Sequence, residues 1–524
     1  MDYIRIGMSS PHHQHQTNSF RQHFRTPSRF MYLVAFVLIL GVTLTFLNIY
    51  ELHKMREDHG LHHVLGPTVE GSHDDKTPGP IVWVEGKNKH TGYLQHVFNV
   101  FKQTGFTVGD QSDDWTVLWA HDYPFKTLSK ELSHMKPYQR VNHFPGSGFV
   151  TNKVSLATSK MKFIPKAFKL PGEKDKFLSY SRTHADTMWV QKNNNHRGIE
   201  IKMASELDLT KEGSFIQEYV DKPFLIDGHK FDIGIYTILT SINPLRVYII
   251  DDDALFRFCP EEYYPFDPKV RNKYVVHDDY MPLWKVPSLH DLYSEKGFNF
   301  KITFNQYLKS KGLDYKKVWA DMIFAIQKVY QEKEHKLIEF GSKYSSTDHF
   351  FEMVRFDFVL DEKLNVYLME ANMSPNLSSL HFPPNKRLYE HVIFNLLSLV
   401  GLAQYVSQEH MGFEEDMRVA ATDVRVYPEV CSKSTCTESC VPAECKLCRR
   451  CVTRPLERML KRAYLEHIQR GSARRVYPAA INETQALLWD PSTVWPGTEE
   501  LSEKNSLMHR WFVGKCQQDK TFCS

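Results

Sequence analysis

The strongest candidate for chemistry in this sequence is the segment 351–377, where three oxygen-bearing side chains interrupt an apolar run. Its pattern predicts two strands joined by a polar turn. Asp357 falls inside the first strand, whereas Glu370 and Asn372 close the second and share one face because they are two residues apart. Charges in apolar surroundings are costly unless they are paired or bind metal, and oxygen ligands suit Mg²⁺ together with substrate phosphates. We therefore predict a magnesium site, with an edge hairpin that has one solvated face as the alternative.

A second group of residues carries positive charge. Lys192 ends a predicted strand and is followed by a polar loop that contains Arg197 and Gly198. A strand followed by a flexible loop with glycine and cations can cover phosphates, although an ordinary hairpin loop has the same composition. Further along, Lys230 and Asp232 begin another strand and share a face. This pair could hold reacting groups or could be a simple surface ion pair.

The chain that must position these groups is long enough for two or three domains. It has 524 residues, of which 42% are hydrophobic and 13% aromatic, so it can build a sizeable core. The formal net charge of +3 is nearly balanced and gives no indication of a nucleic-acid partner.

The N-terminal part predicts a membrane anchor. Residues 1–29 are polar and His-rich and predict a disordered tail, and residues 30–50 form an uncharged run long enough to cross a bilayer as a helix. A cleaved signal peptide is the alternative. More Lys and Arg lie close before the run than after it, which favours a single-pass type II protein with its large domain in the lumen of the endomembrane system. Residues 51–80 predict a stem, and the folded part is expected to begin at Ile81.

The C-terminal region differs in kind from the rest of the chain. Eight cysteines lie after residue 430, which predicts disulfides in an oxidising compartment or a zinc site in the cytosol. Asn482 begins a glycosylation sequon. Residues 455–468 have the apolar spacing of an amphipathic helix with a basic face, which could dock on the domain or bind an acidic surface. Cys259, outside this cluster, is predicted to be a buried core thiol.

Taken together, the ordered motifs resemble the tubulin-tyrosine ligase-like family over residues 81–403. The motifs that carry the resemblance are Asn142 to Gly146, Lys153, Phe163 to Pro165, Lys192 with Arg197 and Gly198, Gln217 to Val220, Lys230 to Asp232, Arg257, Phe356 with Asp357, Glu370 to Pro375, and Leu396 to Leu402. The resemblance implies an α+β ATP-grasp fold, with residues 404–524 following as a Cys-rich, basic region. It also implies an enzyme that uses ATP to convert a protein carboxylate into an acyl phosphate, which the amine of a free amino acid then attacks.

The resemblance also implies roles for individual residues. Mg²⁺ would be bound by Asp357, Glu370 and Asn372. The nucleotide would be bound by Lys153, Lys192, Arg197, Gly198, Gln217, Glu218, Tyr219, Val220, Lys230 and Asp232. Lys230, Asp232 and Arg257 would act on the reacting groups.

Two positions depart from the family pattern. Gly234 stands where the family usually has an arginine, and Glu200 stands where its phosphate loop usually has a glycine. Both changes weaken the compensation of phosphate charge. The expected function is a ligase that adds an amino acid, glutamate in the first instance, to an acidic acceptor, either a tubulin tail or a lumenal protein. The alternative is a catalytically impaired, membrane-anchored protein that binds ATP or a peptide.

Overall fold

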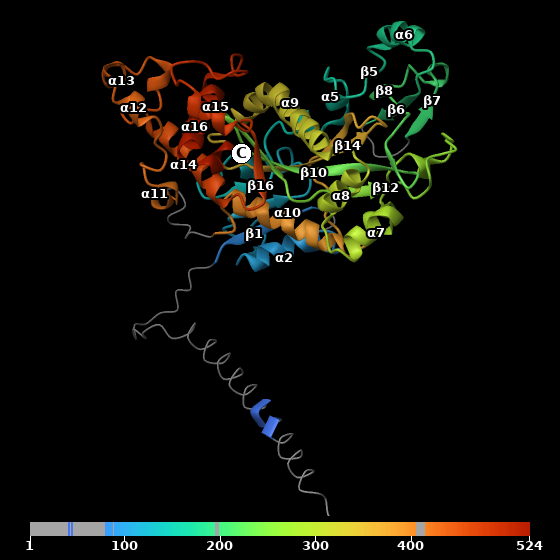
Figure 1. Cartoon of the computed structure of the whole chain (residues 1–524), viewed down its shortest axis with the longest axis horizontal. Helices are drawn as coiled ribbons and strands as arrows, with labels where there is room; N and C mark the ends of the chain where they lie inside the picture. The colour runs from blue at the N-terminus through green and yellow to red at the C-terminus, as the bar shows by residue number, and fades with distance from the viewer. Residues whose placement is uncertain (1–39, 42, 46–78, 87–88, 194–198, 405–413) are drawn as a thin grey trace, which may run out of the picture. The chain divides into compact units, whose positions relative to one another are not determined.

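The computed structural model describes residues 40–41, 43–45, 79–86, 89–193, 199–404 and 414–524. Residues 78–524 form one compact unit (Figure 1). The predicted tail lies outside the described residues, as does nearly all of the predicted membrane span and of the predicted stem.

Three sheets build this unit. A parallel sheet near its N-terminus has the order β2-β1-β3-β4, and a small antiparallel sheet has the order β5-β8-β6-β7. Their strands are β1 (Ile81–Glu85), β2 (Thr107–Gly109), β3 (Val117–Ala120), β4 (Arg140–Val141), β5 (Ala167–Lys169), β6 (Trp189–Asn193), β7 (Glu200–Lys202) and β8 (Ser214–Glu218). The folded part therefore begins at Ile81, as predicted.

The central sheet is organised by one long strand, β10. Along one edge β10 pairs with β12 and β11 in succession, and along the other it pairs with β14, which in turn pairs with β15. The strands of this sheet are β9 (Leu225–Ile226), β10 (His229–Ile242), β11 (Leu245–Ile250), β12 (Leu255–Phe258), β13 (Met281–Pro282), β14 (Glu352–Leu360), β15 (Val366–Asn372) and β16 (Ala473–Tyr477). The predicted hairpin of residues 351–377 is confirmed as β14 and β15.

Helices pack around these sheets and share a continuous apolar core with them. They are α2 (Gln95–Gln103), α3 (Ser129–Leu132), α4 (Gly148–Thr151), α5 (Lys153–Ala157), α6 (Lys174–Thr183), α7 (Pro287–Ser294), α8 (Phe300–Ser310), α9 (Tyr315–Gly341) and α10 (Asn385–Leu399). In α9, apolar residues at helical spacing, from Val318 to Leu337, are buried. The Tyr330 hydroxyl lies 2.9 Å from Oγ1 of Thr237 on β10, which fixes this helix against the sheet.

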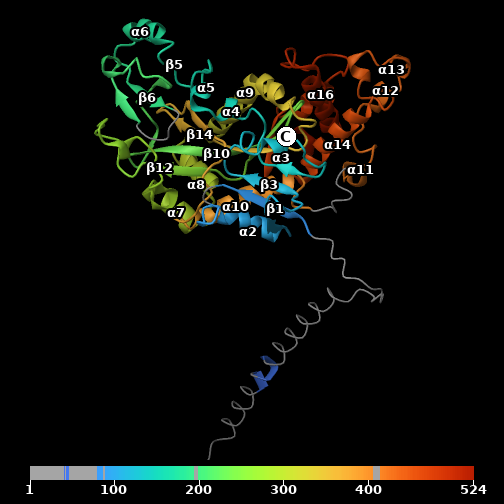
Figure 2. The same cartoon turned by 180° about the vertical axis from the view of Figure 1, so that it is seen from behind.

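The C-terminal region is built into the same unit. Its helices are α11 (Glu414–Arg418), α12 (Pro428–Cys431), α13 (Ser434–Glu438), α14 (Arg454–Gln469), α15 (Glu483–Leu488) and α16 (Glu503–Gln518), and they lie on one side of the unit (Figure 2). Trp511 and Phe512 of α16 belong to a second apolar core, to which α14 and α15 also contribute. β16 extends the central sheet by pairing with β11. The predicted amphipathic helix is confirmed as α14, whose apolar side packs into this second core through Leu460 and Ala463.

All eight C-terminal cysteines form disulfides. The pairs are Cys431–Cys448, Cys436–Cys445, Cys440–Cys451 and Cys516–Cys523. Of the two predicted alternatives, disulfides are therefore confirmed and the zinc site is wrong. Cys259 is free and buried, as predicted. Asn482, in the predicted sequon, caps α15 through its side chain, which accepts a hydrogen bond from the Gln485 amide.

The predicted localisation needs correction. Within the part of the chain that the structure describes, no helix combines the length and the apolar composition that crossing a bilayer requires. This finding contradicts the prediction of a single-pass type II membrane protein with a lumenal domain.

Candidate active site

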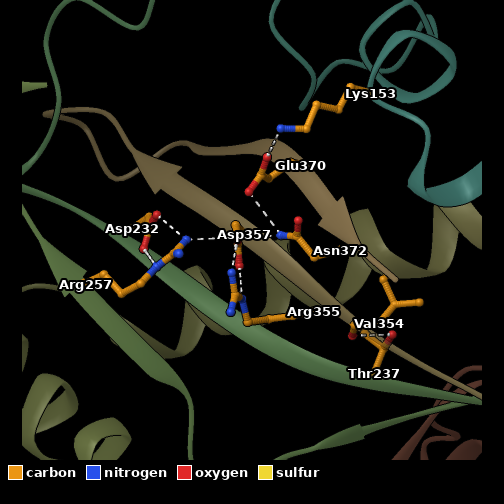
Figure 3. A network of polar contacts seen from close by, with 9 residues as sticks. All are labelled: Lys153, Asp232, Thr237, Arg257, Val354, Arg355, Asp357, Glu370 and Asn372. Atoms are coloured by element: carbon orange, nitrogen blue, oxygen red, sulfur yellow. Dashed lines mark hydrogen bonds and ion pairs between the residues drawn. The ribbon is translucent and has the colours of Figure 1, made fainter. Parts of the chain in front are cut away.

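The three predicted magnesium ligands lie together, with Asp357 inside β14 and Glu370 and Asn372 at the end of β15. The antiparallel register places Asp357 directly opposite Glu370, with Asn372 two pairs further along, opposite Arg355. The Asn372 Nδ2 donates hydrogen bonds to Asp357 Oδ2 at 2.8 Å and to Glu370 Oε1 at 3.1 Å (Figure 3). The structure thus brings together three oxygen-bearing groups on one face of the hairpin.

Three lysines lie around these groups or beside them. Lys153, at the start of α5, places its Nζ 3.2 Å from Glu370 Oε2 (Figure 3). Lys192, on β6, donates a hydrogen bond to Gln217 Oε1 at 3.2 Å. Lys230, at the start of β10, is buried and lies 4.6 Å from the centre of the Tyr219 ring. These cations come from three different elements, which is the arrangement expected for binding a polyanion.

Burial sets the protonation of these groups. Desolvation lowers the pKa of Lys192 to about 8, although the Glu370 carboxylate opposes the shift, and desolvation likewise lowers the pKa of Lys230 to about 8. Burial alone would raise the pKa of Glu370, but Lys153 and the Asn372 hydrogen bond outweigh it and hold that pKa well below its ordinary range. The site therefore keeps the Glu370 carboxylate ionised, while Lys192 and Lys230 lose their protons more readily than exposed lysines do.

Arg257 joins the two buried aspartates of the site. It lies opposite Asp232 in the register between β10 and β12. Its Nε and Nη2 donate to Asp232 at 2.9 and 2.7 Å, and Nη2 also donates to Asp357 Oδ2 at 2.9 Å (Figure 3). Asp232 and Lys230 are both buried, so their charges belong to an internal network rather than to a simple surface pair.

Arg355 is a member of this network that the sequence analysis missed. It is 4% exposed, and its Nε and Nη2 donate to the two oxygens of Asp357 at 2.6 and 2.9 Å. A signal was available, because Arg355 and Asp357 are two residues apart in one strand and must share a face. A buried carboxylate on that face needs a cation, and Arg355 supplies one.

Arg355 also accounts for the departure at Gly234. A Cβ at position 234 would lie 2.8 Å from Cδ of Arg355 and 3.1 Å from Oδ1 of Asp357. The neighbouring strand thus places a guanidinium group beside the backbone of the position where the family usually has an arginine. The site therefore has an arginine on β14 next to the position on β10 where the family usually has one.

Replacing Gly234 by alanine should therefore destabilise the fold. Arg355 is held at both of its donating nitrogens and cannot move aside freely, so we expect a loss of about 1–3 kcal/mol in the free energy of unfolding. Urea unfolding of the wild type and of G234A measures this loss in the free energy of unfolding. Gly172→Ala is the matched control, because a Cβ there would meet no atom within 4 Å. Equal stability of G234A and G172A would show that Arg355 does not fill this space.

The predicted adenine-binding residues, Gln217 to Val220, span the end of β8. The backbone amides of Glu218 and Tyr219 donate to the carbonyls of Lys166 and Met188, at 2.8 and 2.9 Å. These two amides are therefore occupied within the protein, and any adenine contact would use carbonyls, side chains or Val220. The Gln217 side chain is buried and already contacts Lys192.

Part of the predicted phosphate loop is not described. Arg197 and Gly198 lie outside the described residues, as does the Glu200 side chain, although the Glu200 backbone begins β7. The assignments of these three residues stay predictions.

The donor set suits magnesium bound together with phosphate. Among the described residues, no cluster of three or more His, Cys, Asp or Glu side chains could hold a metal by itself. Asp357 and Glu370 supply two carboxylates, and Mg²⁺ commonly uses one or two of them with substrate phosphates and water. Asn372 would offer its Oδ1 only after its amide turns, because its Nδ2 faces both carboxylates.

A cavity of about 220 Å³ opens beside the two arginines. Arg257 and Arg355 form one wall of it, and Tyr93, Tyr280 and Tyr389 form others. Pockets for drug-sized ligands have roughly 300–1,000 Å³, so this space suits a smaller molecule. Its aromatic walls and paired guanidinium groups suit a small ligand that carries a carboxylate.

The family model of the tubulin-tyrosine ligase family matches residues 130–410. A probable tubulin polyglutamylase of Caenorhabditis elegans, ttll-15, is 41% identical over 469 residues, which cover 86% of this chain and 88% of the relative. The chain therefore belongs to the tubulin-tyrosine ligase family.

Two more distant relatives match smaller shares of this chain and of their own length. Mouse tubulin polyglutamylase TTLL6 is 30% identical over 57% of this chain and 38% of its own length. Human tubulin monoglutamylase TTLL4 is 25% identical over 76% of this chain and 33% of its own length. The chain thus spans only about a third of each of these two relatives, whereas it spans most of the Caenorhabditis elegans protein. All three relatives are named for the modification of tubulin.

Proposed function

We propose that this protein is an ATP- and Mg²⁺-dependent ligase with an ATP-grasp fold that joins glutamate to a side-chain carboxylate of tubulin. The observation that carries the proposal is the convergence of Lys153, Lys192 and Lys230 on a hairpin that presents Asp357 and Glu370. Family membership and the names of the relatives support the choice of glutamate and tubulin.

The chemistry proceeds in two transfers. An acceptor carboxylate oxygen attacks the terminal phosphorus of ATP, the bond to the bridging oxygen breaks, and ADP leaves. The glutamate amine then attacks the acyl carbon, phosphate leaves with the bonding electrons, and the nitrogen loses a proton to form the amide. Bound Mg²⁺ would offset charge on the phosphates. The lysines bind and orient the phosphates, since phosphoryl transfer depends mainly on positioning and charge stabilisation.

We assign the 220 Å³ cavity to the incoming glutamate. Arg257 and Arg355 would bind its carboxylates, while the aromatic side chains exclude water. This arrangement argues against the impaired homologue, because the charge that Gly234 lacks is present on Arg355. The free amine of glutamate would then face the hairpin of β14 and β15. The acyl phosphate of the acceptor would form beside that hairpin.

ATP affinity should fall as pH rises through 8. Lys192 and Lys230 have pKa values of about 8 in the free protein, so both lose their charge between pH 7 and pH 9. Phosphates prefer the protonated lysines, so we expect ATP to bind about tenfold more weakly at pH 9 than at pH 7 for each lysine that must gain a proton. Calorimetric titration at the two pH values measures the change.

Lys192→Arg is the control for this pH dependence. Arginine stays protonated throughout this range, so the variant should lose part of the dependence while it still binds ATP. An affinity that is the same at pH 7 and pH 9 would contradict the role of the two lysines.

The proposal as a whole is tested by the requirements for ADP release. The purified full chain should release ADP rapidly only when tubulin and glutamate are both present with ATP and Mg²⁺. A protein that only binds ATP should be stabilised by it but release no ADP above background in any combination. That second outcome would favour the impaired homologue.

A further inference from the structure

A chain of three hydrogen bonds connects Lys230 to the segment that follows β8. Lys230 Nζ donates to the hydroxyl oxygen of Tyr219 at 3.3 Å, and the Tyr219 hydroxyl donates to that of Tyr263 at 3.1 Å. The Tyr263 hydroxyl donates in turn to the backbone carbonyl of Asp221 at 2.8 Å. Three parts of the fold are thus joined at one point: the start of β10, the segment after β8 and the segment after β12.

The last acceptor fixes the direction of the whole chain. A backbone carbonyl only accepts, so Tyr263 must donate its one hydroxyl hydrogen to Asp221. The Tyr263 oxygen is then the acceptor for Tyr219. Because the Tyr219 hydrogen is used in this bond, the Tyr219 oxygen presents a lone pair to the Lys230 nitrogen.

Burial keeps both tyrosines of this relay neutral and in place. Tyr263 is 1% exposed, and its backbone amide donates to the carbonyl of Gly228, in the turn before Lys230, at 2.8 Å. Desolvation raises the pKa of Tyr219 and of Tyr263, so neither hydroxyl loses its proton near neutral pH. The Lys230 nitrogen also lies 4.6 Å from the centre of the Tyr219 ring, so the hydroxyl and the ring both favour the charged lysine.

Three further titratable side chains act on Lys230, and their charges are constant or opposed to it. Asp232 favours the charged lysine, and burial raises the pKa of this carboxyl to about 6. Burial raises the pKa of the Cys259 thiol to about 12, so this thiol is neutral. Lys192 and Lys230 repel each other. Between pH 7 and pH 9 Asp232 stays ionised, and the hydrogen bond from the Lys230 nitrogen goes to Tyr219.

We propose that Tyr219 and Tyr263 are positioning residues, whose relay holds the Lys230 ammonium group charged and directed toward the phosphates of ATP. An ammonium group has three hydrogens, so one bond to Tyr219 leaves two for phosphate oxygens. The inference rests on the part of the proposed function in which Lys230 binds phosphate. It gives Tyr219, expected to contact the nucleotide, a role that acts through Lys230 instead.

The ATP affinity of Tyr219→Phe at pH 7 and pH 9 tests the relay. The variant keeps the ring and removes the oxygen that accepts from Lys230. If the pKa of Lys230 falls by about one unit from its value of about 8, the loss of affinity relative to the wild type becomes about fivefold larger at pH 9 than at pH 7. Calorimetric titration of the full chain with ATP and Mg²⁺ measures both losses. A tyrosine that only packs or stacks on adenine would cost the same factor at both pH values, and that result would overturn the proposal.

Tyr263→Phe tests the relay one step further from the phosphates. Without its acceptor, the Tyr219 hydroxyl is no longer held with its hydrogen away from Lys230. The affinity for ATP should therefore fall, and again fall more at pH 9 than at pH 7. Because Tyr263 acts on Lys230 through Tyr219, the double variant should bind ATP as Tyr219→Phe does. Losses that add in the double variant would show two independent roles and would contradict the relay.

Tyr264→Phe is the matched control. Tyr264 follows Tyr263 directly and is 56% exposed, so this variant should keep the wild-type affinity at both pH values. If Y219F and Y263F bind ATP as Y264F does while the wild type modifies tubulin, the relay is wrong and the proposed function stands. If the predicted pH pattern is found but tubulin is not modified, the relay stands and the proposed function is wrong. A wild type that does not bind ATP would overturn both.

Discussion

Glu370→Gln should lower ligase turnover at least about a hundredfold, because a charged magnesium ligand becomes neutral at the point where phosphate charge must be offset. The glutamine keeps the size of the side chain and can still accept the hydrogen bond from Asn372. We therefore expect the free energy of unfolding to change little. Steady-state ADP release with tubulin and glutamate measures the loss.

Glu339→Gln is the control for this substitution. Glu339 is exposed on α9 and pairs only with Lys336 and its neighbours, so its loss of charge should leave turnover unchanged. If E370Q turned over as fast as E339Q, then Glu370 would not bind the metal and the assignment of the site would be wrong.

Asp357→Asn should cost both turnover and stability. Asp357 is buried and accepts hydrogen bonds from Arg257 and Arg355, so the neutral amide would leave two buried guanidinium groups with one carboxylate, Asp232, between them. Breaking a buried ion pair by removing one partner costs about 3–5 kcal/mol. Urea unfolding measures this loss, and ADP release measures the accompanying loss of activity.

The comparison of the two variants separates catalysis from folding. E370Q should be inactive and stable, whereas D357N should be inactive and unstable. Asp321→Asn, which removes one partner of an exposed pair with Lys317 on α9, should change neither property. If D357N were as stable as D321N, the two arginines would not depend on Asp357, and the network drawn in Figure 3 would be wrong.

The sequence predicted the parts of the site that short-range patterns encode. The apolar run of residues 351–377 and its polar turn were enough to predict β14 and β15, and the two-residue spacing placed Glu370 and Asn372 on one face. The apolar spacing of α14 was equally clear. Local periodicity was sufficient in each case because each feature lies within one hairpin or one helix.

Long-range pairing could not be predicted in this way. β16 joins β11 across more than two hundred residues, and nothing in its five residues names that partner. The disulfide connectivity depends on the folded positions of the cysteines, which their spacing does not determine. Arg355 was overlooked because attention to the carboxylates left out the cation that must neutralise them, although the period of the strand places it beside Asp357.

The membrane prediction shows a different limit. An uncharged run at residues 30–50 satisfies a rule about composition, but the helices in the described part of the chain do not include one able to span a bilayer. The cysteines form disulfides, which was one of the two predicted alternatives, although the localisation inferred with it was contradicted. The uncharged run, the cysteines and the sequon all favoured a lumenal domain, and their agreement did not make that localisation correct.

The most direct test of the central claim is mass spectrometry of tubulin after incubation with the full chain, ATP, Mg²⁺ and isotope-labelled glutamate. We predict tubulin peptides that carry labelled glutamate on a side-chain carboxylate, with none formed by E370Q. Unmodified tubulin in the presence of wild-type protein that demonstrably binds ATP would contradict the claim that this site is a glutamate ligase.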